Sequence, residues 1–250
     1  MHRFYIPPIH WNPDRLQLDE GEIHHAADVL RIQPGERIVV FNGRGAEITA
    51  EVEAISRREI ALRRLHEGRT APLACRITLG QAIPKGKNMD LIVQKATELG
   101  AAGIIPLRSE RTVVQCSEGD AARKQAKWQG VAIEAAKQCG QNWLPEVAAP
   151  VTPRAFFEEK PSFDLMLIAS LQPDALHPRH VLAEAEALLG RKPASVLILI
   201  GPEGDFTPAE IALAKSHGCR PITLGPIVLR TETAALYTLS ILSYELLSVG

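Results

Sequence analysis

The chain has 250 residues, and 46% of them are hydrophobic, which allows a buried core and excludes general disorder. Its 28 basic and 29 acidic side chains give a net charge of −1, so the overall balance does not indicate a nucleic-acid binder. The charge is uneven, however. Residues 76–140 hold 10 basic against 6 acidic side chains, net +4, and residues 141–250 hold 8 against 12, net −4. The middle section is therefore the part expected to meet a polyanion.

The four cysteines indicate reduced thiols rather than a metal site or a disulfide framework. They are widely spaced and form no C-x-x-C pair, at positions Cys75, Cys116, Cys139 and Cys219. The N-terminus carries no apolar signal segment. The apolar tail at 234–249 is too short and too often interrupted by polar residues to span a bilayer. We therefore expect a cytoplasmic protein without a membrane segment and without a metal ion.

The first 70 residues are predicted to form a small β-barrel. Ile38–Phe41 is a short apolar strand, and Asn42-Gly43 behind it is a strong hairpin-turn signal. Ala46–Ile55 alternates apolar and charged residues, the period of a half-buried strand, and Ile60–Leu62 fits a third strand. Only Ile23–Leu30 has a helical pattern.

From Cys75 onward, strand and helix patterns alternate. This alternation predicts an α/β domain with a mostly parallel sheet covered on both faces. Gly, Thr and Pro interrupt the strand pattern near 68–73, which divides the chain into domains 1–70 and 74–250. The expected strands are Ile77–Ala82, Gly103–Leu107, Asp164–Ala169, Ser195–Ile200 and Pro221–Leu224. The expected helices are Met89–Leu99, Asp120–Cys139, Pro178–Leu189, Pro208–His217 and Thr231–Ser248.

Ligands of open α/β sheets bind beyond the carboxyl ends of the strands, which directs attention to two loops. The first runs from Gly201 to Phe206, and its two glycines permit close backbone approach. It lacks the lysine of a P-loop and the three glycines of a dinucleotide fingerprint, so alone it is typical of an ordinary turn. Thr207, Pro208 and Glu210 form a capping box, which gives Glu210 a structural role and leaves Glu203 without one.

The second loop, Leu224–Ala234, is unusually apolar. The conservative interpretation makes Arg230 and Glu232 a solvated pair and Thr231 a helix cap. An apolar run from Ile227 to Leu229 beside a Gly-Pro turn is a poor surface loop, however, and a good wall for a flat, partly apolar ligand.

These two loops together resemble those of the SPOUT-class RNA methyltransferases. Within that class, the chain is most similar to the 16S ribosomal RNA uracil-N3 methyltransferase (RsmE) family. Further matching segments cover nearly the whole chain: Lys85-Gly86-Lys87, Gln94–Gly100, Ile105–Leu107, Trp128-Gln129, Ala132–Gly140 and Pro145. The start of the chain is similar to the family's PUA-like RNA-binding domain, in Arg3-Phe4-Tyr5, His24-His25 and Val29-Leu30-Arg31.

The resemblance implies a C-terminal trefoil knot with S-adenosylmethionine bent in a cleft of its loops. Backbone groups and apolar side chains would hold the adenine. The implied cofactor-binding residues are Leu171, Gly201, Glu203, Gly204, Leu224, Gly225, Ile227, Leu229 and Ala234. The resemblance also implies a homodimer, and the last helix is apolar around most of its circumference, as an interface helix would be. We expect this helix at the interface, with Leu239 and Leu242 contacting the second subunit.

In the implied reaction the enzyme must activate the methyl acceptor, because uracil N3 becomes nucleophilic only once its proton leaves. Arg230 is the candidate for stabilising charge on the uracil carbonyl oxygens, and Glu232 or Glu203 for accepting a proton or orienting Arg230. His24 and His25 fall in the other domain, which favours packing or RNA contact. The expected contacts to 16S ribosomal RNA in the small subunit are Arg3, Arg31, Lys87, Arg108 and Arg111.

Two positions depart from the family pattern, which usually has arginine where this chain has Gln141 and often where it has Lys127. They concern RNA or subunit contacts rather than the cofactor site.

Two other functions are compatible with the sequence: a SPOUT enzyme that methylates ribose 2′-O in RNA, and a non-catalytic ribosome-assembly factor. The long segments Lys85–Gly100 and Trp128–Gly140 disfavour the first, and the intact loops disfavour the second.

Overall fold

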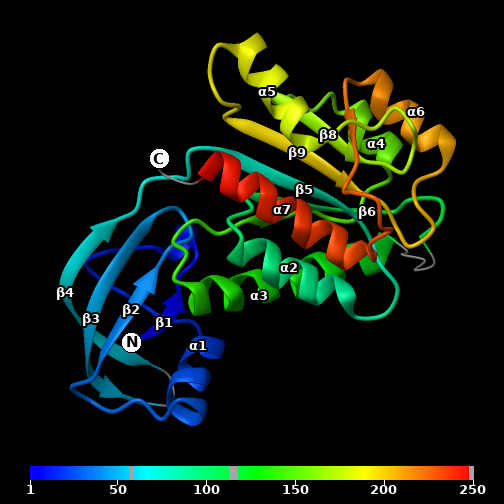
Figure 1. Cartoon of the computed structure of the whole chain (residues 1–250). Coiled ribbons are helices and arrows are strands. Elements are labelled where there is room, and N and C mark those ends of the chain that lie inside the picture. The colour runs from blue at the N-terminus through cyan, green and yellow to red at the C-terminus, as the bar shows by residue number, and fades with distance from the viewer. Residues whose placement is uncertain (57–58, 113–117, 248–250) are drawn as a thin grey trace. The chain divides into compact units, whose positions relative to one another are not determined.

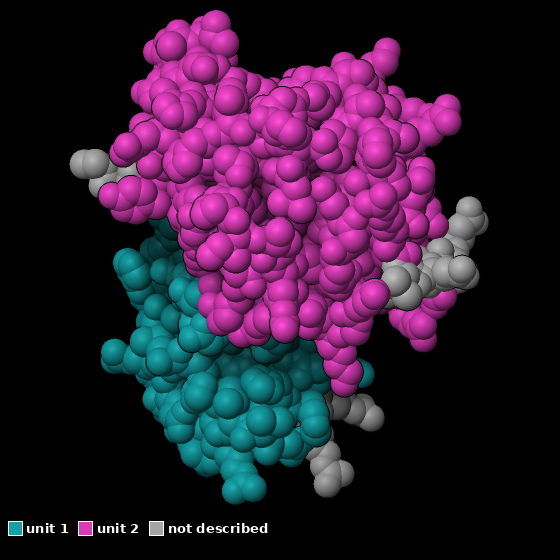
Figure 2. Space-filling view, turned by 45° about the vertical axis from the view of Figure 1, so that its right-hand side comes forward, with its two compact units in different colours: residues 1–72, 133–144 teal, residues 73–132, 145–250 magenta. Residues whose placement is uncertain are grey.

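The structure, a computed structural model, describes residues 1–56, 59–112 and 118–247. The chain divides into two compact units (Figure 2). Unit 1 comprises Met1–Pro72 and Ile133–Leu144, and unit 2 comprises Leu73–Ala132 and Pro145–Gly250. The sequence pattern places the boundary at nearly the same point but assigns 133–144 to the second domain. Among the described residues, no helix has the length and apolar character that crossing a membrane requires.

Unit 1 is built on a four-stranded sheet in the order β1-β2-β3-β4 (Figure 1). Its strands are β1 (His2–Tyr5), β2 (Arg37–Phe41), β3 (Ala46–Ile55) and β4 (Ile60–Arg69). β1 runs parallel to β2, and the other neighbours are antiparallel. Alternate residues of the strands, Phe4, Val40 and Ile48 among them, are buried in one core. The predicted β-rich N-terminal domain is confirmed; in its described part the edge strands β1 and β4 do not pair with each other.

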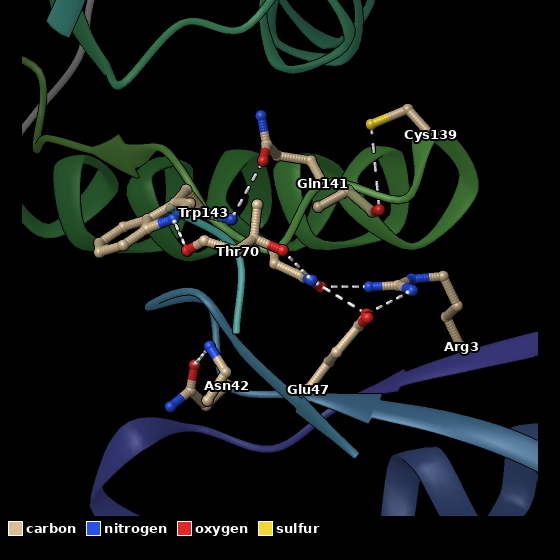
Figure 3. Close-up of polar contacts among 10 residues, drawn as sticks. Arg3, Asn42, Glu47, Thr70, Cys139, Gln141 and Trp143 are labelled. Atoms are coloured by element: carbon tan, nitrogen blue, oxygen red, sulfur yellow. Dashed lines mark hydrogen bonds and ion pairs between the residues drawn. The ribbon is translucent and has the colours of Figure 1, made fainter. Parts of the chain in front are cut away.

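Residues 133–144 join unit 1 through hydrogen bonds to the β2–β3 turn and to the end of β4. The backbone of Asn142 accepts from Gly45, and the side chain of Asn142 contacts Glu47 and Thr70 at 2.9 and 2.8 Å. Trp143 donates its indole N–H to the Thr70 carbonyl at 2.9 Å (Figure 3). These partners lie far apart in sequence, so no local pattern predicts them.

Unit 2 contains a parallel six-stranded sheet in the order β10-β8-β9-β5-β6-β7 (Figure 1). The strands are β5 (Arg76–Ala82), β6 (Gly103–Leu107), β7 (Glu146–Val147), β8 (Leu165–Ala169), β9 (Ser195–Ile200) and β10 (Arg220–Ile222). The central strands β5 and β9 are buried nearly throughout. This burial explains the continuous apolar run of β9. The parallel pairing of all neighbouring strands confirms the predicted parallel sheet.

Helices cover both faces of this sheet. The helices are α2 (Asn88–Glu98), α3 (Glu118–Cys139), α4 (Pro153–Glu158), α5 (Pro178–Leu189), α6 (Pro208–Ser216) and α7 (Thr231–Leu247). All belong to unit 2 except the last part of α3, residues 133–139, which belongs to unit 1. α7 packs on α2, β5 and β9, whereas α4 and α6 pack together on the other face (Figure 1). The chain therefore leaves the edge strand β10 and returns to the middle of the sheet, a path with which the implied trefoil knot is consistent.

The differences from the predicted elements have local causes. Strand β4 continues to Arg69 rather than ending at Leu62, because its outer half is exposed and polar and so lacks an alternating pattern. The helical segment Ile23–Leu30 is instead α1 (Glu20–His24) followed by a π turn (His25–Val29). The missed elements are short, and their partners are distant in sequence: β1, β7 and α4. Ser248, the expected last residue of α7, lies outside the described residues.

Candidate functional site

A pocket lies at the carboxyl edge of the unit 2 sheet, where the loops after β8, β9 and β10 meet. It has a volume of about 90 Å³, or about 580 Å³ with its open mouth included. Its lining comprises Ala169, Ser170, Leu171, Ile200, Gly201, Pro202, Glu203, Asp205, Leu224, Gly225, Ile227, Val228, Leu229, Thr231 and Ala234. The lining thus contains eight of the nine residues implied by the resemblance, and Gly204 is outside it.

The loop after β9 is tightly folded. A Cβ atom added to Gly201 would stand 3.1 Å from both the Asp205 carboxylate and the Phe206 backbone nitrogen. Asp205 adopts a positive φ of 60°, which is uncommon for a residue with a side chain, and its carboxylate accepts from the Phe206 N–H at 2.7 Å. A side chain at Gly201 would therefore press on the turn itself, in addition to any closeness to a ligand.

The two glutamates of this loop region have separate tasks. Glu210 forms the predicted capping box with Thr207, and it also accepts hydrogen bonds from the Ser109 hydroxyl and the Glu110 backbone, each at 3.0 Å. Its structural role is confirmed. Glu203 accepts from the Lys85 backbone N–H at 2.9 Å and so connects the pocket loop to the segment that follows β5.

A buried polar chain ties α7 to the pocket loops. Gln81, at the carboxyl end of β5, is fully buried and donates to the Thr231 hydroxyl at 2.9 Å. Thr231 in turn donates to the Gly201 carbonyl at 2.7 Å. Among the described residues, the Gln81 carbonyl oxygen has no hydrogen-bond partner. This series of hydrogen bonds fixes the start of α7 against the loop after β9, and it thereby also fixes the backbone position of Arg230.

We expect Thr231→Val to lower the free energy of unfolding by about 1–3 kcal/mol, because it removes a hydroxyl on which two buried groups depend. Thr231→Ser retains the hydroxyl and should lose much less. Urea unfolding followed by circular dichroism measures both values. Thr231→Val keeps the methyl group and Thr231→Ser keeps the hydroxyl, so a loss for Thr231→Val no larger than that for Thr231→Ser would contradict the role of the polar chain.

Arg230 and Glu232 lie at the N-terminal end of α7, next to the pocket. Arg230 is exposed and Glu232 is half-buried. Among the residues that the structure describes, neither side chain forms an ion pair or a hydrogen bond, so the two do not form the solvated pair of the conservative interpretation. The expected contact of Glu203 with Arg230 is also absent there, since the Glu203 carboxylate binds Lys85 instead. Both Arg230 and Glu232 are available to an incoming substrate.

The apolar wall of the pocket is strongly exposed. Ile227 and Val228 are 74% and 72% exposed, and Leu171 across the pocket is 64% exposed. The backbone groups of Ile227, Val228 and Leu229 form no hydrogen bonds with other described residues. A flat heterocycle at this wall would therefore find both apolar side chains and free peptide groups.

The five predicted RNA contacts are divided between the two units: Arg3 and Arg31 belong to unit 1, and Lys87, Arg108 and Arg111 belong to unit 2. The Arg3 side chain is only 15% exposed, and it binds Glu47 at 3.1 Å and also Asn142 (Figure 3). Its guanidinium lies over the Phe41 ring. The structure thus gives Arg3 a structural role in unit 1. Arg31 is exposed with a φ of 54°, Lys87 is exposed beside α2, and Arg108 is half-buried. Arg111 donates to the Gly204 carbonyl, which places it at the outer side of the pocket loop.

Several residues of the site escaped the sequence analysis. Ser170, Asp205 and Thr231 line the pocket, and Gln81 supports it from β5. Thr231 was interpreted as a cap alone. For Gln81 the available signal was a polar residue at the end of an apolar strand, directly before the segment Lys85-Gly86-Lys87.

The family model of an RNA methyltransferase domain matches residues 71–243, and that of an RNA methyltransferase PUA domain matches residues 18–63. Among curated proteins, the ribosomal RNA small subunit methyltransferase E of Bacillus subtilis is 31% identical over 90% of this chain and 88% of its own length. The protein of the same name from Aquifex aeolicus is 32% identical over 97% and 99%.

Solved structures agree. A putative methyltransferase from Legionella pneumophila in complex with S-adenosylmethionine is 35% identical, with a TM-score of 0.87 over 98% of both chains. A ribosomal RNA small subunit methyltransferase E from Neisseria gonorrhoeae bound to S-adenosylmethionine is 32% identical, with a TM-score of 0.83 over 98% of both.

Proposed function

We propose that this chain, which belongs to the RNA methyltransferase family, methylates N3 of a uridine in 16S ribosomal RNA. It is an S-adenosylmethionine-dependent ribosomal RNA methyltransferase, as its similarity to the ribosomal RNA small subunit methyltransferases E shows. The observation that carries the proposal is the pocket at the carboxyl edge of the sheet, with an unpaired arginine directly beside it.

The pocket suits S-adenosylmethionine in charge and in shape. Its charged lining residues in the described part of the chain are both acidic, Glu203 and Asp205, which favours a cationic sulfonium. Leu171, Ile227 and Leu229 supply apolar surface for the adenine, and the free peptide groups of 227–229 supply donors and acceptors. We propose that the lining residues of this pocket hold the cofactor, with Gly204 acting through the shape of its loop.

The cofactor supplies an activated methyl group, so the protein must prepare the acceptor. Once the N3 proton leaves, negative charge spreads from N3 over the uracil carbonyl oxygens, and this charge is neutralised when N3 takes the methyl group that bound S-adenosylmethionine would supply. The Arg230 guanidinium, with its five N–H donors and no acidic partner among the described residues, is the group that stabilises this charge. Glu232, also unpaired there, is the candidate acceptor of the proton.

Methyl incorporation tests the proposed function. The protein is incubated with labelled S-adenosylmethionine and either assembled small subunits or free 16S ribosomal RNA. We expect label in the RNA and a defined affinity for the cofactor in calorimetry. Cofactor binding without incorporation into either substrate would contradict the proposed substrate. Failure to bind the cofactor would instead favour a non-catalytic RNA-binding assembly factor.

We propose that the enzyme is a homodimer joined at α7. Leu239 and Leu242, the expected interface residues, are 0% and 1% exposed within a single chain, so they belong to its own core and are not at the interface. The free side of α7 carries Tyr237 and Tyr244, 48% and 75% exposed, seven residues apart and thus on one face. Ile227 and Val228 add exposed apolar surface just ahead of the helix. Such a surface is typical of an interaction site.

We expect the unmodified protein to sediment as a dimer at micromolar concentration, and Tyr237→Asp combined with Tyr244→Asp to sediment as a monomer. Leu188→Asp is the matched control, since Leu188 is 85% exposed on α5 and also receives a charge. Thermal stability of the unmodified protein should rise with its concentration. An unmodified monomer with full methylation activity would contradict the dimer.

A further inference from the structure

A second pocket of unit 2 lies between α2 and α3. It has a volume of about 400 Å³. Its lining comprises Ile83, Gly86, Met89, Asp90, Arg123, Lys124, Lys127 and Trp128. We call this pocket the α2–α3 groove. Its floor is apolar, with Ile83, Met89 and Trp128 each less than 5% exposed.

The rim of the α2–α3 groove is cationic. Three basic side chains line it against one acidic side chain, so the lining carries a net charge of +2. Two further lysines, Lys85 and Lys87, flank the lining residue Gly86, and both are exposed. The groove is thus the place where the positive charge of residues 76–140 is concentrated around a hollow. Because the chain as a whole is nearly neutral, its overall composition does not account for this local concentration of positive charge.

The ion pairs at the rim of the groove are exposed, so an incoming anion can displace their aspartates. Lys127 contacts Asp90 at 2.6 Å, and Arg123 contacts Asp120 at 2.7 Å, but the Lys127 and Arg123 side chains are 56% and 80% exposed. Exposed pairs contribute little to stability, because water competes for both charges. A phosphate can therefore replace an aspartate at low cost. Asp90 keeps a second task, since it also accepts from the Trp128 indole N–H at 3.1 Å.

The groove is connected directly to the cofactor pocket. Gly86 lines the groove and Glu203 lines the cofactor pocket, and the Lys85 N–H donates to the Glu203 carboxylate at 2.9 Å. A single hydrogen bond thus joins the segment that lines the α2–α3 groove to the loop that lines the cofactor pocket, and both lie at the carboxyl edge of the sheet. A nucleotide held at the methyl-transfer site has neighbours on the same strand, and their phosphates must pass over this edge.

We propose that the α2–α3 groove binds the phosphodiester backbone of the RNA strand that flanks the target uridine. The inference rests on the proposed function, because it takes RNA as the substrate. Arg123, Lys124 and Lys127 bind phosphate oxygens, and the apolar floor accommodates a sugar or base edge. These contacts orient the strand without reading its sequence.

The test compares the double variant Arg123→Ala/Lys124→Ala with Arg154→Ala/Lys215→Ala. The control removes the same charge from exposed, ion-paired positions on α4 and α6. Binding of free 16S ribosomal RNA is measured by filter retention over a series of KCl concentrations. Cofactor affinity, measured by calorimetry, reports whether each variant is folded, and methylation of the same RNA by the unmodified protein tests the proposed function separately.

We expect the groove variant to bind RNA roughly 10–100-fold more weakly at low salt, since two phosphate contacts are lost. The slope of log affinity against log salt should become shallower by about 1.4, at about 0.7 per contact. Cofactor affinity should stay unchanged in both variants. The inference is overturned if the groove variant keeps the affinity and salt slope of the unmodified protein, or if the control loses as much.

Discussion

Gly225→Val is expected to abolish detectable S-adenosylmethionine binding while the protein remains folded. Gly225 lines the cofactor pocket with a φ of 111°, a conformation that a β-branched residue adopts only under strain. A Cβ atom at this position would have no neighbour within 4 Å, so nothing in the protein itself blocks the side chain. The effect should therefore come from a displaced loop and a narrowed pocket. Calorimetry with the cofactor measures it, and circular dichroism confirms folding.

Gly190→Val is the matched control for this variant. Gly190 also has a positive φ, 67°, and also has open space around an added Cβ atom, but it ends α5 outside the pocket lining. It should bind the cofactor normally. Gly201→Val is a less clean test, although the same loss is expected, because its Cβ atom would collide with Asp205 and Phe206. Normal affinity in folded Gly225→Val would move the cofactor site elsewhere.

Arg230→Ala is expected to lower the turnover number by roughly 10²–10³, the usual cost of losing a donor that stabilises transition-state charge. Cofactor affinity should change little, because Arg230 is exposed and not part of the pocket lining. Single-turnover methylation of small subunits gives the rate, and calorimetry gives the affinity.

Two further variants help to interpret the turnover number of Arg230→Ala. Arg230→Lys keeps the charge but loses the planar fork of donors, so it should recover only part of the rate. The Arg123→Ala/Lys124→Ala variant should show its defect at low RNA concentration and a near-normal rate at saturating RNA. A near-normal turnover number for Arg230→Ala would make this arginine a bystander, and a loss confined to cofactor affinity would make it a binding residue.

Elements defined by their own local sequence were predictable. Ser195–Ile200 and Pro178–Leu189 have the predicted bounds, because a buried apolar run and a Pro-started helix before Gly190 are local signals. The capping box at Thr207 and Glu210 was predictable for the same reason. The rule that ligands bind beyond the strand ends was sufficient to select the two loops that meet at the pocket.

Features that depend on distant partners were not predictable. Asn142 and Trp143 belong to unit 1 only through bonds to residues some 70 to 140 positions away, so the sequence offered no reason to separate them from α3. Arg3 was predicted to contact RNA from its charge, and charge alone does not reveal that its side chain is largely buried against Glu47 and Asn142; the RNA contact stays a prediction. Leu239 and Leu242 were predicted at a dimer interface because an apolar helix pattern does not show whether the same chain or a second subunit covers the helix.

The identity of the methylated nucleoside tests the central claim most directly. Small subunits from cells that lack the enzyme are incubated with the protein and methyl-labelled S-adenosylmethionine, and their RNA is digested to nucleosides for mass spectrometry. The proposed roles of Arg230 and Glu232 predict that the label is in 3-methyluridine. Label in a 2′-O-methylated ribose, or its absence from RNA that the protein demonstrably binds, would contradict the account.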